Sequence, residues 1–236
     1  MFGVAEDHDS NPIKIGLGKL KTRGAKYVSV NPVQTGYSAI ADEWISITPG
    51  TDGLFVMSLI HELLRAGKVD VDYLIRYTNA PYLVIDNPGE ADDGLFAHTE
   101  NGEELCWDTR TDKELSHKTP ELKPAMKGAY TLENGKKVRP VFQILAKRYL
   151  DQSFSPKNVA RKIGVEVNVI SRIAKEIATV AFQEEIIINE PWVDWRGEKH
   201  TQMIGRPVAM HAMRGISAHS NGFHTCRAIH LLQILI

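Results

Sequence analysis

The sequence has few of the features that mark disulfide-stabilised, membrane-spanning or nucleic-acid-binding proteins. Its 236 residues include only two cysteines, Cys106 and Cys226, which are too few for a disulfide framework. No apolar run reaches the roughly 18 residues that a spanning helix needs. Lys and Arg number 28 against 29 Asp and Glu, so no overall positive field attracts nucleic acid or an acidic membrane. We therefore expect no nucleic-acid partner and no direct membrane insertion.

Complete nucleotide-binding motifs are also absent. Gly16-Leu17-Gly18 begins like a dinucleotide fingerprint, but Lys21 stands where the third glycine belongs. No P-loop is present. These absences disfavour a free-standing nicotinamide enzyme. The sequence as a whole is 43% hydrophobic and 24% charged. This composition and length suit one large folded domain or two small ones.

Residues 1–78 alternate between strand and helix patterns. Strand-like runs at 26–30 and 44–47 are each followed by a helical pattern, and the clearest helix begins near Asp52 and stops at Gly67. Strands that alternate with helices indicate a parallel sheet covered on both faces. We predict the α/β class, with a doubly wound, mostly parallel sheet.

The rest of the chain divides into three parts. Turn pairs such as Asn134-Gly135 separate short strand-like pieces in residues 79–140, which predicts an irregular insertion with hairpins. Residues 141–199 are expected to form a helical segment packed on the core. Residues 200–236, with a strand at 207–210, should return to the α/β core begun by residues 1–78.

Four polar loops follow the predicted strands, at residues 3–9, 31–35, 49–52 and 211–221. Ligands of doubly wound sheets bind at the carboxyl ends of the strands, where such loops lie. Turn chemistry alone also makes loops polar, so a single loop is weak support. Four of them together favour a binding edge.

The most specific of these loops is Pro49-Gly50-Thr51-Asp52. A carboxylate at a helix N-terminus can simply cap the free N–H groups of the first turn. The alternative is a nucleotide contact. Asp52 would repel a phosphate, but its two oxygens can accept parallel hydrogen bonds from N1–H and N2–H of guanine. An acidic group here therefore favours a guanine base over a pyrophosphate.

Residues 155–180 resemble a helix-turn-helix with Gly164 in the turn. Arg161 and Arg172 could contact phosphates in such a module. The neutral total charge and the position between two α/β pieces favour a packed helical hairpin instead. A nucleic-acid module at 155–180 stays as an alternative.

The loop at 211–222 is rich in Gly, Ser and His. Its histidines match no zinc-ligand spacing, so we predict no metal ligands and a pocket lining instead. Arg214 is the candidate charged contact, because Gly215 beside it allows close backbone approach. A solvated surface arginine is the competing interpretation.

Two segments resemble the molybdopterin oxidoreductases of the dimethyl sulfoxide reductase type. They are residues 23–32, a strand ending in Asn31-Pro32, and residues 41–52, which hold Ala-Asp-x-Trp and Pro-Gly-Thr-Asp. Residues 156–178 are similar to the family's Pro-x-x-x-Ala-x-x-x-Gly-Val helical stretch, and residues 214–222 to its Gly-x-x-x-His-x-x-Gly loop. The resemblance spans nearly the whole chain.

The resemblance implies two-electron redox chemistry at molybdenum or tungsten, held by two molybdopterin guanine dinucleotides (bis-MGD). By position, the residues implied in cofactor binding are Gly3, Val4, Ala5, Glu6, Asp7, His8, Asn31, Pro32, Val33, Gln34, Thr35, Gly50, Thr51, Asp52, Arg214, Gly215 and Ala218. Arg214 and His219 are the candidate catalytic residues. An arginine there would suit an anionic sulfur substrate, and the loop is nearest to the sulfur-compound branch, which includes tetrathionate, thiosulfate and polysulfide reductases and sulfite dehydrogenases.

The family's cysteine motif for a 4Fe-4S cluster and its metal-ligating residue are not found in this sequence. The chain also stops within an apolar helical pattern at 228–236. We therefore expect an internal fragment that is inactive alone, whose parent enzyme works with an iron–sulfur electron-transfer subunit. By the same resemblance, a membrane-anchor subunit is expected. A non-catalytic α/β binding protein is the remaining alternative.

Overall fold

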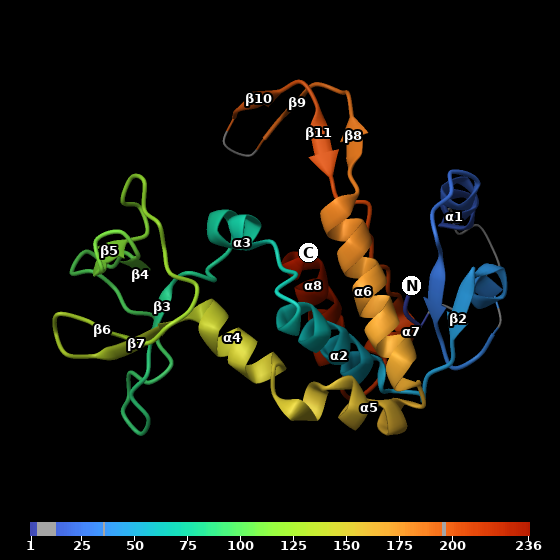
Figure 1. Ribbon diagram of the computed structural model, residues 1–236, viewed down its shortest axis with the longest axis horizontal. Coiled ribbons are helices and arrows are strands. Elements are labelled where there is room, and N and C mark those ends of the chain that lie inside the picture. Colours follow the sequence, from blue (N-terminus) through green and yellow to red (C-terminus); the bar gives the residue numbers. More distant parts are fainter. Residues whose placement is uncertain (4–12, 35, 195–196) are drawn as a thin grey trace. The chain divides into compact units, whose positions relative to one another are not determined.

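The computed structural model describes residues 1–3, 13–34, 36–194 and 197–236 (Figure 1). The chain forms two compact units. The first holds residues 1–69, 151–234 and 236, and the second holds residues 70–150 and 235. Helices and strands both occur along the chain, which confirms the predicted α/β class.

Short parallel segments form the sheet of the first unit. Strand β1 (Val28–Val30) pairs in parallel with β2 (Glu43–Ile45). Phe2 bridges Val30 on one side and Ala212 on the other, again in parallel. The order across the sheet is therefore Ala212, Phe2, β1, β2. Parallel pairing within the described residues is limited to these segments, because the other strand pairs there are antiparallel.

Helical connections join the parallel segments, as parallel pairing requires. Helix α1 (Ile13–Thr22) precedes β1, and the short 3-10 helix η1 (Gly36–Ile40) links β1 to β2. Helix α2 (Asp52–Arg65) follows β2, where the sequence predicts the clearest helix. Its buried residues recur at helical spacing and form the core of this unit. They include Phe55, Val56, Leu59, Ile60 and Leu63.

Helix α2 packs against α5 (Pro156–Ile163), α6 (Val167–Gln183) and the 3-10 helix η2 (Gln152–Phe154). Gly164 ends α5 in the left-handed conformation, with φ +73°. The apolar face of α6 is buried in this packing. Arg172, which a nucleic-acid module would offer to phosphates, instead donates to Glu43 on β2 and to Glu176 on its own helix. These contacts favour the packed helical hairpin.

After α6 the chain forms an arm of two antiparallel ribbons (Figure 1). Strand β8 (Ile186–Ile188) pairs with β11 (Met203–Gly205), and β9 (Trp192–Val193) pairs with β10 (Lys199–His200). None of these strands is predicted from the sequence. The predicted strand at 207–210 is wrong, because no strand covers those residues and the sheet contact that follows them is the single bridge at Ala212.

Helices α7 (Arg214–Ser217) and α8 (Gly222–Leu235) follow Ala212. Thr225, Ala228, Ile229 and Leu232 of α8 are buried at helical spacing. No described helix combines the length and apolarity needed to cross a membrane.

The second unit has its own sheets and core. It holds α3 (Val71–Tyr77), β3 (Leu83–Ile85), β4 (Leu105–Asp108), β5 (Lys113–Ser116), β6 (Tyr130–Thr131), β7 (Lys137–Pro140) and α4 (Val141–Tyr149). Strands β3, β7 and β6 form one antiparallel sheet, and β4 pairs with β5. Trp107 stacks on Tyr130 with ring centroids 4.5 Å apart. Gly135 has φ +82° between β6 and β7, as an Asn-Gly hairpin turn requires.

Candidate functional site

Four predicted loops follow the four parallel segments of the first unit. Gly3 follows Phe2, Asn31 follows β1, Gly50 lies beyond β2, and Arg214 lies beyond Ala212. Parallel segments share a direction, so their carboxyl ends meet at one edge. The edge predicted from the sequence is therefore present in the described residues.

Gly3 and the segment of Arg214 contact each other at this edge. Gly3 has φ +60°, and a Cβ there would collide with Ile216 of α7. A Cβ on Gly215 would lie 2.6 Å from the carbonyl oxygen of Gly3. Both positions therefore require glycine because two backbones approach closely.

The Pro49–Asp52 turn lies against the loop at 219–221. The Asn221 side chain donates from Nδ2 to the carbonyl oxygen of Gly50 at 3.0 Å. Gly50 has φ +79°, and a Cβ there would lie 3.7 Å from Nδ1 of His219. Residues more than 160 positions apart in the sequence thus form one surface.

Asp52 is the buried acidic group of this edge, with 5% of its surface exposed. It is the first residue of α2, after Thr51, whose side chain donates to the carbonyl oxygen of Thr48 at 2.7 Å. Oδ1 of Asp52 has no hydrogen-bond partner among the described residues. Burial raises the pKa of this carboxyl, against the opposing effects of its own backbone N–H and of His219. One oxygen of this buried carboxylate is therefore left unsatisfied by the described residues.

Asn31 is buried and holds the turn after β1. Its backbone N–H donates to Ile45 at 3.1 Å, and its carbonyl oxygen accepts from Nε1 of Trp44 at 2.8 Å. Val33 and Gln34, further along the turn, are exposed, and Pro32 is half-buried. The Asn31 turn therefore presents Val33 and Gln34 to solvent while Asn31 itself is fixed.

The candidate catalytic residues are exposed. Arg214 is the first residue of α7, and within the described part of the chain its guanidinium has no ion-pair partner. His219 and Ala218 follow in the same loop and are exposed as well. Val4, Ala5, Glu6, Asp7, His8 and Thr35 lie outside the described residues.

A curated relative aligns with the whole chain. It is the A chain of the sulfite dehydrogenase of Allochromatium vinosum, 42% identical over 245 residues, which cover 100% of this chain and 25% of that protein. The chain belongs to the molybdopterin oxidoreductase family. The perchlorate reductase alpha subunit of Dechloromonas aromatica is 28% identical over 69% of this chain and 21% of its own. No family model matches the chain.

A solved structure agrees with the fold of this molybdopterin oxidoreductase chain. Acetylene hydratase from Pelobacter acetylenicus matches with a TM-score of 0.52 at 13% identity, over 94% of this chain and 19% of that one. The chain spans about a quarter of the length of its sulfite dehydrogenase relative and less of the others.

Several residues that organise this edge of the sheet are not among the predicted binding residues. Trp44 holds Asn31, Asn221 holds Gly50, and Ile216 packs on Gly3. Thr225 of α8 packs so closely on Gly53 that a Cβ on Gly53 would lie 2.8 Å from its Oγ1. Trp44 stands in the quoted Ala-Asp-x-Trp motif, so its importance is visible in the sequence. The other contacts join residues that are far apart in the sequence, so no local motif predicts them.

Proposed function

We propose that this chain is the part of a molybdenum or tungsten oxidoreductase catalytic subunit that holds a guanine end of the molybdopterin guanine dinucleotide cofactor. The observation that carries the proposal is the buried carboxylate of Asp52, whose Oδ1 has no hydrogen-bond partner among the described residues. A buried acceptor left without a donor costs free energy. A ligand that brings donors to Asp52 removes that cost.

Guanine brings the matching donors. Its N1–H and N2–H point the same way, so one carboxylate can accept both hydrogen bonds in a bidentate pair. Gly50 beside Asp52 has no side chain to obstruct the base, and Asn221 fixes the Gly50 carbonyl oxygen. The residues present therefore fit the nucleotide end of this cofactor.

The bound cofactor supplies the metal centre for two-electron oxidation or reduction. The residues of this chain bind and orient it: Asp52 holds the base, and the Asn31 turn and Gly3 approach the rest of the dinucleotide from the same edge. An iron–sulfur cluster elsewhere in the enzyme and an electron-transfer subunit would carry the electrons. The sulfite dehydrogenase relative is itself named as one subunit of its enzyme, which supports an assembly of several subunits.

The guanine proposal is tested by calorimetric titration of the 236-residue chain with GMP, IMP and AMP. We expect GMP to bind most tightly. IMP lacks the N2 amino group and should bind roughly 10–100-fold more weakly, because a hydrogen bond to a charged group contributes about 1.5–3 kcal/mol. AMP offers no matching donors and should bind more weakly still.

Asp52→Asn is the decisive variant, and Asp72→Asn is its matched control. Asp72 also lies in the first turn of a helix, α3, but it is exposed. Asp52→Asn should abolish the preference for GMP over IMP, whereas Asp72→Asn should leave it intact. Equal affinities for GMP and AMP in the unmodified chain would refute the guanine contact.

We further propose that the substrate of the intact enzyme is a small sulfur oxyanion and that Arg214 binds it. Arg214 is exposed, has no ion-pair partner in the described residues, and offers a fork of donors suited to an oxyanion. His219 lies in the same loop and could move a proton. In the intact enzyme, Arg214→Ala should raise the KM for sulfite sharply, whereas Arg227→Ala, at another exposed arginine, should not. An unchanged KM in Arg214→Ala would remove this role.

A further inference from the structure

The tip of the arm carries three potential metal ligands on one face. His200 pairs with Trp192 across the ribbon, and Lys199 pairs with Val193. Side chains alternate between faces along a strand, so Asp194 and Glu198, the next pair, share the face of Trp192 and His200. Lys199 and Val193 occupy the opposite face. The register alone therefore gathers two carboxylates and an imidazole.

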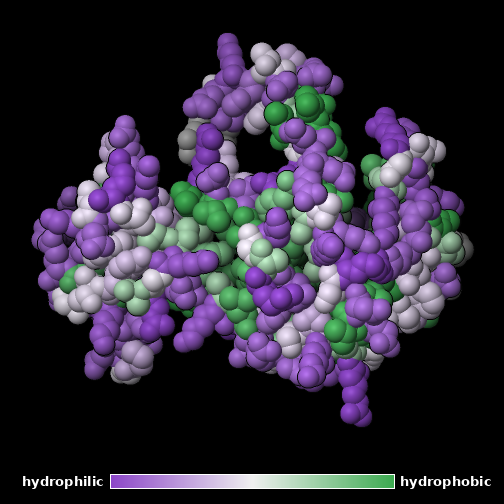
Figure 2. Space-filling view, viewed as in Figure 1, coloured by the Kyte–Doolittle hydropathy of each residue, from purple (hydrophilic) through white to green (hydrophobic). Residues whose placement is uncertain are grey.

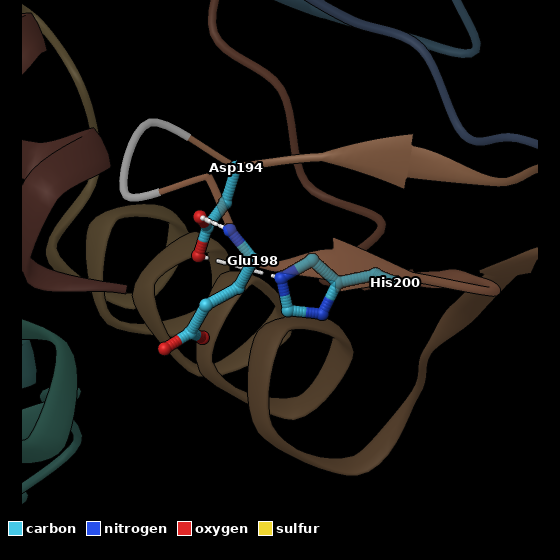
Figure 3. A group of neighbouring side chains, drawn as sticks. All are labelled: Asp194, Glu198 and His200. Atoms are coloured by element: carbon cyan, nitrogen blue, oxygen red, sulfur yellow. Dashed lines mark hydrogen bonds and ion pairs between the residues drawn. The ribbon is translucent and has the colours of Figure 1, made fainter.

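Asp194 and His200 face each other, and the Glu198 side chain extends beside them (Figure 3). One ligand atom from each of Asp194, Glu198 and His200 lies within 4.8 Å of the other two. Nε2 of His200 is 3.3 Å from Oδ2 of Asp194. This spacing leaves room for one ion to contact all three groups.

The hairpin holds these ligands in place. The backbone N–H of Asp194 donates to the carbonyl oxygen of Glu198 at 3.0 Å, and the N–H of Glu198 donates back to Oδ1 of Asp194 at 2.9 Å. The imidazole of His200 stacks on the Trp192 ring at 4.5 Å and 20°, which fixes its orientation. The Trp192 indole is held in turn by its Nε1–H, which donates to Gln202 at 3.0 Å.

Two further observations point to a bound cation. Nε2 of His200 is buried, and no hydrogen bond of good geometry satisfies it among the described residues. The Asp194 side chain is only 8% exposed, and it lies beside the exposed carboxylate of Glu198. A divalent ion would satisfy the imidazole nitrogen and offset both negative charges.

We propose that Asp194, Glu198 and His200 bind a divalent transition-metal ion of the zinc type, with water completing its coordination. Imidazole nitrogen and carboxylate oxygen are ordinary zinc ligands. Strands β9 and β10 have two residues each, and so short a ribbon is marginally stable alone. The ion fastens the tip of the arm, because binding to the ordered hairpin stabilises it. This structural site is separate from the edge that holds Asp52.

Titration of the 236-residue chain with Zn²⁺ tests the site. We expect one zinc ion per chain. Glu198→Gln, which keeps the backbone of the turn, and His200→Ala should each weaken binding by more than the roughly 10–100-fold that loss of a group supporting a metal ligand costs. His224→Ala, at an exposed histidine of α8, and Cys226→Ser should leave the affinity unchanged.

Co²⁺ gives a second measurement that does not depend on the variants' affinity for zinc. A paramagnetic ion on His200 should quench the fluorescence of the stacked Trp192, and the quenched part of the emission should fall in Trp192→Phe. Absence of zinc binding in the unmodified chain would overturn the proposal. So would binding that survives in Glu198→Gln and His200→Ala, or binding that is lost in Cys226→Ser.

Discussion

Replacing Asp52 with asparagine should stabilise the nucleotide-free chain, although it removes a residue that we assign to binding. Two effects oppose each other at this position. A negative charge in the first turn of α2 is favourable by about 0.3–1 kcal/mol. A buried acceptor without a donor costs about 1–3 kcal/mol, and more when it is charged. Asparagine keeps an acceptor oxygen but removes the charge, so it relieves the extra cost of a buried acceptor that is charged. Because Oδ1 is buried and unsatisfied, we expect this relief to exceed the lost helix-end interaction, and Asp52→Asn to gain about 1 kcal/mol.

The pH dependence of that gain follows from the raised pKa of Asp52. Burial makes the charged form costly in the folded chain, so the folded pKa lies above the ordinary value of 3.8. The destabilisation is complete at pH values above the folded pKa and fades as the pH falls through it. Below 3.8 the carboxyl is protonated in both states, and the advantage of asparagine should disappear.

Urea denaturation followed by circular dichroism, at neutral pH and at a pH below 3.8, measures both effects. In thermal unfolding, 1 kcal/mol corresponds to roughly 2–4 °C for a chain of this length. Asp72→Asn should change stability by less than about 0.5 kcal/mol, because Asp72 is exposed. If Asp52→Asn is no more stable than the unmodified chain at neutral pH, the carboxylate is not an unsatisfied group and the reasoning fails.

Saturating GMP should reverse the order of stability. A ligand that binds only the folded state stabilises it in proportion to the logarithm of its concentration relative to Kd. The unmodified chain should therefore gain stability from GMP, whereas Asp52→Asn should gain little. A binding group is expected to lower the stability of the chain when the ligand is absent and to raise it when the ligand is bound.

Other changes test the fold around the site. Gly50→Ala should destabilise the chain by about 1–2 kcal/mol in urea denaturation, because φ +79° is unfavourable for a side chain. Arg172→Met should cost about 1 kcal/mol at low salt and less at high salt. Arg172 lowers the pKa of Glu43 below its ordinary value of 4.5, so the cost should vanish as the pH falls from 4.5 through the lowered pKa of the folded chain. Burial raises the pKa of Cys106 to about 12, so a thiol reagent should label Cys226 first and Cys106 only on unfolding.

The sequence predicts the turns and the helix start at this edge well, because their signals are local. Pro49-Gly50 supplies a turn, Asp52 opens a helix, and the apolar spacing of α2 marks its buried face. The Asn31-Pro32 pair ends β1 for an equally local reason, since proline cannot donate to a ladder. The described residues of the four loops fall at one edge because parallel pairing aligns the ends of the segments.

The pairing partners are harder to predict. Residues 207–210 have the composition of a strand, but the residue that bridges Phe2 is Ala212, and a short apolar run carries no information about register. The Ile186–Ile188 run follows the long apolar pattern of α6, so periodicity alone does not separate strand from helix there. The three isoleucines are β-branched, which favours a strand. All three are nevertheless substantially exposed.

The exposed apolar residues of the arm show that a hydrophobic sequence pattern does not by itself predict burial. Figure 2 shows a hydrophobic patch there, to which Ile187, Ile188 and Ile204 contribute with 53%, 44% and 56% of their surfaces exposed. Burial is a property of the whole fold, whereas hydrophobicity is a property of the residue, so a strand can be apolar without belonging to a core.

The site likewise depends on the whole fold, because segments far apart in the sequence form it together. Asn221 reaches Gly50 across 171 residues, and Gly3 packs against Ile216. A nucleotide that binds Asp52 would therefore rest on a surface whose halves come from opposite ends of the sequence. Its binding free energy should favour the state in which those ends are docked, since only that state presents the complete edge. Removing Asn221 should accordingly weaken GMP binding without touching the base, because the Gly50 turn would lose the contact that fixes it.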